Sequence, residues 1–256
     1  MTRVLRSDIY RFGKSKLLYG VIFFIALVSF LLTVMIRGDI RLGVSMFGNL
    51  LLFRDVNDIL RMGIEYQNGL GFFIAIVISV FIGHEYQWHT WQNKWLIAKN
   101  RTGMYISKLI CSSLCAVIVF VIYQLVVIIG SGQASVVFSY NRMVFISGIF
   151  IYATLGSVIC LIAIVSKNMI YGVICSLCYV LFVETLVSLI GTIRNFSESV
   201  GRVFEWLISR SLFGLSTTIL SPEFTQRSMF LLALNAMMLI LIHTTIGLLL
   251  FRKQEL

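Results

Sequence analysis

The chain has 256 residues, of which 59% are hydrophobic and only 12% are charged, and its formal net charge is +10. A soluble domain would carry roughly a quarter charged residues, so this composition excludes an ordinary water-soluble fold and makes lipid the expected solvent. The apolar runs are continuous rather than alternating and there is one proline, which disfavours an outer-membrane barrel or another all-β fold.

The predicted elements begin with a basic, amphipathic segment, Arg3–Lys16, which we expect to lie along the inner membrane surface. The apolar run after it is too long for a signal peptide, so we expect it to remain as the first span. A bilayer core of about 30 Å requires roughly 20 apolar residues in a helix. We therefore predict an all-α integral membrane fold, a single transmembrane domain over 1–256, with six spans at about 17–36, 66–84, 109–129, 143–165, 169–190 and 229–251.

Two of the connections that are predicted to lie outside are long. The first, Arg37–Asn68, has an apolar centre. The second, Gly191–Ser228, has two apolar clusters that are too short to span and are interrupted or flanked by charge. We expect the second connection to form two short re-entrant or interfacial helices that end at Pro222.

The orientation follows from the loop lysines and arginines, which are enriched on the cytoplasmic side of membrane proteins. With the N-terminus inside, the inside segments carry a large basic excess and the outside segments are nearly balanced. Both termini are therefore predicted to be cytoplasmic. The basic charge then reflects topology, and nucleic acid is not an expected partner.

Two short motifs resemble a nucleotide-binding site and a zinc site, but their residues do not have the spacing that such sites require. Gly13-Lys14-Ser15 resembles the end of a phosphate-binding loop, but the glycine that the motif requires five residues earlier is Asp8. His84, Glu85 and His89 resemble a zinc site, but the histidines are five residues apart rather than four, so they do not face one metal on a helix. We predict neither a nucleotide site nor a metal site here.

The segment Glu85–Asn100 is predicted to form an amphipathic helix in the inner interface. Trp88, Trp91 and Trp95 recur at helical spacing on one face, which is typical of an interfacial aromatic belt. The polar side of this helix would then face the cytoplasm. Glu85 is expected near its start, where a carboxylate favours the helix dipole.

These features together resemble a known family. Glu85, Tyr86, Thr90, Arg101 and Lys108 follow one another as in the permease subunits of type-2 ATP-binding-cassette exporters, of the bacteriocin- and bacitracin-immunity and phenol-soluble-modulin exporter kind. The six spans, the leading amphipathic helix and the short external helices match the same architecture. The chain departs from the family at 88–89, where Trp-His replaces the usual Asn-Gly.

The resemblance implies that the chain is not an enzyme and holds no cofactor of its own. Two copies of a separate cytoplasmic ATPase, which binds ATP and Mg, would dock under the helix between spans two and three. The residues implied in this coupling are Glu85, Tyr86, Thr90, Lys94 and Arg101. A second permease copy, identical or not, would complete the transporter in a bacterial cytoplasmic membrane.

A substrate path is expected on the outer side, lined by Glu184, Phe204 and Trp206. A carboxylate inside a span is costly against lipid, so Glu184 should face a path or form a structural hydrogen bond between helices. The apolar walls suit an amphipathic peptide or a lipophilic antibiotic that is exported. The alternatives are a non-transporting membrane sensor or assembly protein and, as a third reading, an intramembrane metalloenzyme.

Overall fold

The computed structural model describes residues 2–38, 42–46, 49–53, 55–88, 90–91, 101–132, 134–193, 198–221 and 224–253. The helices are α1 (Thr2–Gly13), α2 (Lys16–Arg37), α3 (Val56–Met62), the 3-10 helix η1 (Tyr66–Asn68), α4 (Leu70–Gln87), α6 (Arg101–Gly130), α7 (Ala134–Ser166), α8 (Met169–Ile193), α9 (Glu198–Arg210), α10 (Leu212–Leu220) and α11 (Gln226–Lys253). Two strands, β1 (Leu42–Met46) and β2 (Asn49–Phe53), pair antiparallel.

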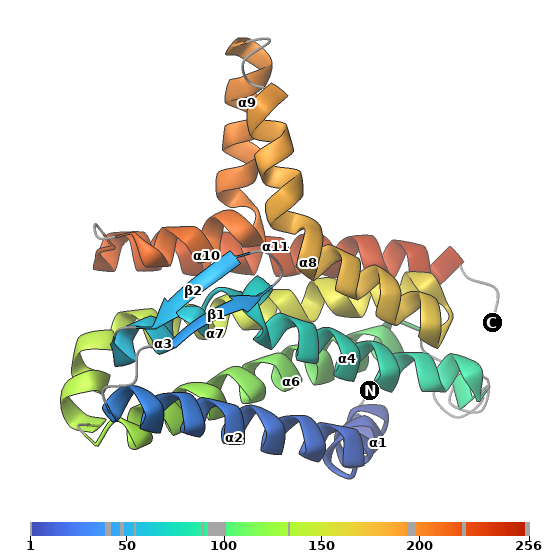
Figure 1. Cartoon of the computed structure of the whole chain (residues 1–256). Coiled ribbons are helices and arrows are strands. Elements are labelled where there is room, and N and C mark those ends of the chain that lie inside the picture. Colours follow the sequence, from blue (N-terminus) through green and yellow to red (C-terminus); the bar gives the residue numbers. More distant parts are fainter. Residues whose placement is uncertain are drawn as a thin grey trace.

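Six of the described helices are long and apolar enough to cross a membrane: α2, α4, α6, α7, α8 and α11. This confirms the all-α, multi-pass membrane fold that the sequence predicts. In Figure 1 these helices form a bundle, with α6 and α7 between α2 and α11. Helix α1 lies at one end of the bundle, and α3 lies at the other.

The six helices differ in how much of their apolar surface the bundle covers. In the most apolar stretch of α7, 67% of the residues are buried, against 11% for α11 and 17% for α8. The interior helices approach closely at small residues. A Cβ atom on Gly156 of α7 would lie 2.6 Å from the Ser112 carbonyl oxygen of α6. Such contacts hold helices together in lipid, where burial against another helix gives little hydrophobic gain.

The ends of several helices lie beyond the predicted spans. Helix α6 begins at Arg101 and α7 at Ala134, each about two turns before the apolar run that predicts it. Polar residues at these ends are buried and paired, as Lys108 is, so hydropathy alone underestimates the helix length.

The connection between α2 and α4 contains structure that the sequence analysis did not predict. It holds the β1–β2 hairpin, α3 and η1. The predicted extension of span two upstream through Tyr66 is wrong, because Gly69 has φ 146° and separates η1 from α4. Glycine adopts this backbone region without a Cβ penalty. Downstream, α4 continues past the predicted end at 84, to Gln87.

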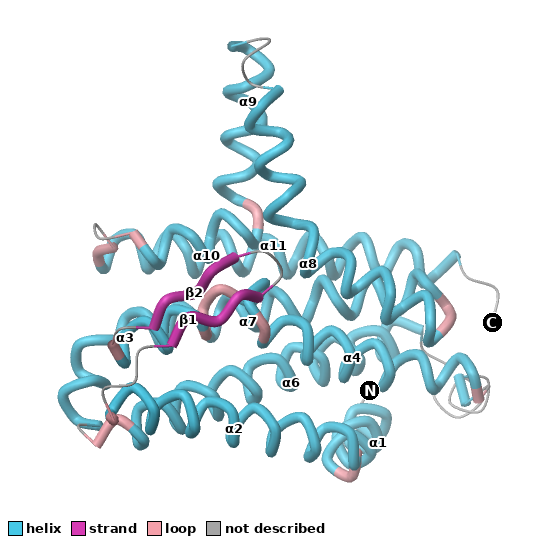
Figure 2. Tube along the Cα trace, viewed as in Figure 1, coloured by secondary structure: helices cyan, strands magenta, loops and turns pink. Residues whose placement is uncertain are grey.

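The connection between α8 and α11 contains the two predicted short helices, α9 and α10. Figures 1 and 2 show that the last part of α8 and the antiparallel α9 project from the bundle, whereas α10 lies back against it. Helix α10 begins where the Ser211 hydroxyl accepts a hydrogen bond from the Gly214 amide at 3.2 Å. The predicted end at Pro222 lies outside the described residues.

Candidate functional site

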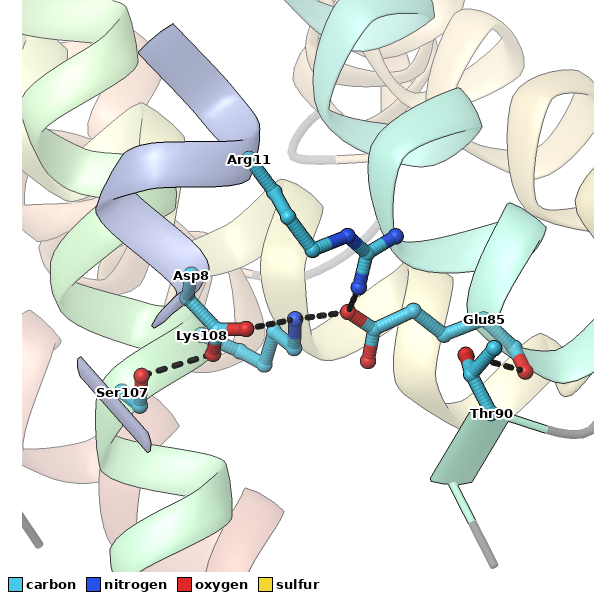
Figure 3. Close-up of polar contacts among 6 residues, drawn as sticks. All are labelled: Asp8, Arg11, Glu85, Thr90, Ser107 and Lys108. Atoms are coloured by element: carbon cyan, nitrogen blue, oxygen red, sulfur yellow. Dashed lines mark hydrogen bonds and ion pairs between the residues drawn. The ribbon is translucent and has the colours of Figure 1, made fainter. Parts of the chain in front are cut away.

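A buried cluster of charged side chains joins α1, α4 and α6 (Figure 3). Lys108 of α6 donates from Nζ to Asp8 Oδ1 of α1 at 2.9 Å and to Glu85 Oε1 of α4. Ser107 Oγ donates to the other Asp8 oxygen at 2.7 Å. Arg11, one turn after Asp8, donates to the same Glu85 oxygen that Lys108 contacts. Three elements far apart in the sequence therefore meet at one ion cluster.

The cluster is removed from solvent and balanced in charge. Asp8 and Glu85 are fully buried and Lys108 is 1% exposed, whereas the Arg11 side chain is 38% exposed. Two carboxylates and two cations cancel one another's formal charge. Burying Asp8, Glu85 or Lys108 without a partner of opposite charge would be expensive, so these three side chains depend on one another.

Aromatic rings complete the surroundings of the two cations. Lys108 Nζ lies 4.7 Å from the centre of the Phe81 ring, and the Arg11 guanidinium lies 5.7 Å from it. The Phe12 ring meets the same ring edge-on, with centroids 5.0 Å apart. Ring faces attract cations, so Phe81 adds to the ion pairs rather than merely filling space.

Helix α1 is the amphipathic segment predicted to lie along the inner membrane surface, but one of its faces packs against the bundle. Asp8 and Phe12 face the bundle, whereas Tyr10 is 61% exposed. The segment that resembles a phosphate-binding loop is the junction between α1 and α2. There the Ser15 hydroxyl accepts a hydrogen bond from the Leu18 amide at 3.4 Å, so it caps α2.

Glu85 was expected near the start of a cytoplasmic helix, and this expectation is wrong. It lies in the last turn of α4, where the chain is still in the helix of span two. Its neighbour His84 is exposed, so the two side chains do not face one site, and His89 lies outside the described residues. Among the residues that the structure describes, no group of three or more metal-ligating side chains could hold an ion.

Trp88 and Trp91 do not share one face, so the prediction is wrong for these two tryptophans. Trp88 is the C-cap of α4 and is 72% exposed, but Trp91 is 2% exposed. The two residues do not lie on one continuous helix, because α4 ends at Gln87. Lys94 and Trp95, and most of the predicted coupling helix with them, lie outside the described residues.

The remaining predicted coupling residues lie around Glu85. The Thr90 hydroxyl donates to the Glu85 carbonyl oxygen at 3.3 Å, and the Tyr86 hydroxyl donates to the Ile164 carbonyl oxygen of α7 at 3.4 Å. Arg101 is the first residue of α6. These contacts connect both sides of the segment 88–100 to the bundle.

A row of aromatic rings links this segment to the last helix. Trp91 packs between Tyr86 and Phe251 of α11, with ring centroids 5.2 Å from each. The Tyr105 ring of α6 lies 6.2 Å from Phe251, and its hydroxyl donates to the His243 carbonyl oxygen at 3.1 Å. The end of α11 is therefore packed directly against the α4–α6 segment.

The predicted path residues lie elsewhere, on α8 and α9. Glu184 is exposed on α8, Phe204 is partly buried, and Trp206 is 54% exposed beneath the Arg210 guanidinium at 4.4 Å. Glu184 also comes near Glu65, which the sequence did not indicate. Burial raises the pKa of Glu65; a hydrogen bond from Asn68 lowers it, and the Glu184 carboxylate raises it further.

The sequence analysis missed Asp8, Arg11 and Ser107. A signal was present for the first two, because Asp8 is an acid in an otherwise basic helix and lies one turn from Arg11. Ser107 gave no such signal. The resemblance did include Lys108 and its partner Glu85, but not Asp8.

No protein-family model matches this sequence, and a search of curated proteins finds no significant match. The six apolar helices and the contacts described above are therefore the basis for assigning a function.

Proposed function

We propose that this chain is the transmembrane permease subunit of an ATP-driven exporter, with both termini in the cytoplasm of a bacterium. The observation that carries the proposal is the ion cluster of Asp8, Arg11, Glu85 and Lys108. It connects α1 to the two helices that flank the segment 88–100. A force applied to that segment would therefore be transmitted to α1, α4 and α6.

The aromatic contact between Trp91 and α11 also supports the proposal. Because Trp91 packs on Phe251, a displacement of the same segment would also reach the last span. Two routes thus lead from one short segment into four helices. Such an arrangement suits a helix on which a separate ATPase, supplying ATP and Mg, would act from the cytoplasm.

The exposed faces of α8, α9 and α11 support a dimer of permeases with two ATPases. Glu184 projects from a membrane-spanning helix that the rest of the chain covers little. We place a second permease copy against α8, because only 17% of the most apolar stretch of this helix is buried. We assign Glu184, Phe204 and Trp206 to that outer surface, and amphipathic peptides or lipophilic antibiotics to the exported class.

Purification of the full chain from its producing cells in mild detergent tests the proposal. We expect a protein with nucleotide-binding motifs to co-purify in equal amount and to hydrolyse ATP. Lys94→Glu should weaken this association, whereas the matched charge reversal Lys14→Glu, in the turn between α1 and α2, should not. A chain that purifies without any ATPase, and that moves no amphiphile in the presence of ATP, would instead be a sensor or assembly protein.

The orientation has its own test. A reporter fused after Leu256 and a second inserted at Gln133 should report opposite sides of the membrane, the first cytoplasmic. Two reporters on one side would contradict the proposed topology.

A further inference from the structure

An apolar cavity of about 230 Å³ lies between α2 and α4. One wall is formed by α2, with Phe24, Val28 and Leu32. The opposite wall is formed by Phe73 of α4 and by Gly69, which precedes that helix. Met62 of α3 and Tyr123 of α6 complete the lining. The cavity lies toward the end of the bundle at which α3 packs, whereas the ion cluster lies at the end where α1 packs (Figure 1).

Water is not a suitable occupant of this cavity. The one hydroxyl in its wall, on Tyr123, already donates to the Ile59 carbonyl oxygen at 2.8 Å. The Gly69 carbonyl oxygen accepts from the Phe72 amide at 3.1 Å. A buried water requires two to four polar partners, which these walls do not offer. An empty space of this size would forfeit the dispersion contacts that close packing provides.

The cavity reaches the surface that α2 turns toward lipid. Phe24 lines it and is 49% exposed, and its ring lies 5.4 Å from that of Phe73, so these two rings border the opening. Leu27 and Leu31, on the adjoining face of α2, are 44% and 50% exposed. At this depth in a membrane the solvent around α2 is hydrocarbon.

We propose that the cavity holds an acyl chain of a bilayer lipid, inserted between α2 and α4. The chain enters past Phe24 and Phe73 and ends against Met62, whose unbranched thioether side chain adapts to a flexible ligand. The site is independent of the exporter assignment, because only the apolar walls and the membrane position enter the argument.

Photolabelling tests the proposal. The full-length protein is placed in nanodiscs whose phospholipid carries a diazirine midway along one acyl chain, and adducts are mapped by mass spectrometry after irradiation. Met62 is the diagnostic position, since it is partly buried and lines the cavity floor. We expect adducts at Met62 in the wild type. Because the probe is a phospholipid, such adducts assign the chain to bilayer lipid rather than to an exported substrate.

Two neighbouring leucines provide matched variants. Leu32→Trp fills the cavity and should lower Met62 labelling by at least about five-fold, whereas Leu31→Trp projects into lipid and should leave it unchanged. If Leu32→Trp does not fold, Val28→Phe makes the same test with a smaller side chain. Absence of Met62 adducts in the wild type, or equal labelling in both tryptophan variants, would overturn the proposal.

Discussion

The two ends of the helix bundle are held together by different chemistry. At the end where α1 lies, α4 and α6 are joined through the charged side chains of Asp8, Glu85 and Lys108. At the opposite end, neutral side chains bind α3 and the turn after it. Tyr123 donates to the Ile59 carbonyl oxygen, Gln124 to that of Leu60 at 3.0 Å, and Tyr152 to that of Gly63 at 2.6 Å.

The neutral end is specified by geometry. The last carbonyl groups of a helix have no partner within the helix, and side chains of α6 and α7 supply partners for those at the end of α3. Each of these three donors has one acceptor at a fixed position. A shift of α3 would therefore break the hydrogen bonds.

The ionic end allows alternative pairings. Glu85 accepts from both Lys108 and Arg11, and Lys108 donates to both Glu85 and Asp8. A small movement of α1 could therefore exchange partners without leaving a charge alone. The comparison indicates that the ionic end suits movement and the neutral end suits a fixed position, which agrees with placing the coupling segment at the ionic end.

The largest expected effect follows the loss of the central cation. Lys108→Met removes the cation that both buried carboxylates contact. Breaking a buried charge pair on one side costs about 3–5 kcal/mol, so thermal unfolding in detergent should shift strongly downward. Adding Asp8→Asn removes the second charge and leaves Glu85 with Arg11. The double variant should recover part of the loss, and a double variant no more stable than Lys108→Met would contradict the pairing.

The second largest loss of stability is expected from a steric change at the neutral end. A Cβ on Gly63 would lie 2.4 Å from a Tyr123 ring carbon and 2.9 Å from Gln124 Nε2. Forcing a methyl group into such a site costs about 1–3 kcal/mol, so Gly63→Ala should lower the unfolding temperature in detergent. Gly20→Ala on α2 is the matched control, because a Cβ there meets nothing within 4 Å. Equal behaviour of the two variants would show that α3 can move aside freely.

This comparison also separates what the sequence could predict from what it could not. Continuous apolar runs predicted the six spans because the bilayer fixes their length. The ion cluster could not be located from hydropathy. Asp8 and Lys108 are a hundred positions apart, and their pairing depends on how α1 folds back against α6. Likewise, nothing local at Tyr152 indicates that its hydroxyl binds Gly63.

A smaller effect is expected for a single neutral hydrogen bond. Tyr152→Phe keeps the ring, which stacks on Phe120 with centroids 4.5 Å apart, and removes only the bond to the Gly63 carbonyl oxygen. The loss should be about 1 kcal/mol and insensitive to salt, again measured by thermal unfolding. Tyr171→Phe, at an exposed position of α8, should change little. A loss as large as that of Lys108→Met would mean that the neutral end, not the ionic end, dominates the stability of the bundle.

The smallest effect is expected at the rim of the ion cluster. Arg11 is partly exposed, and the Glu85 oxygen that it contacts is also held by Lys108. Exposed ion pairs contribute about 0–1 kcal/mol and are screened by salt. Arg11→Ala should therefore cost less than 1 kcal/mol, and the cost should shrink further as salt is raised. Arg6→Ala, an exposed position on the same helix, controls for the loss of a basic charge at the membrane surface. A large, salt-independent loss for Arg11→Ala would mean that Lys108 alone cannot neutralise both buried carboxylates. Partner exchange within the cluster would then be excluded.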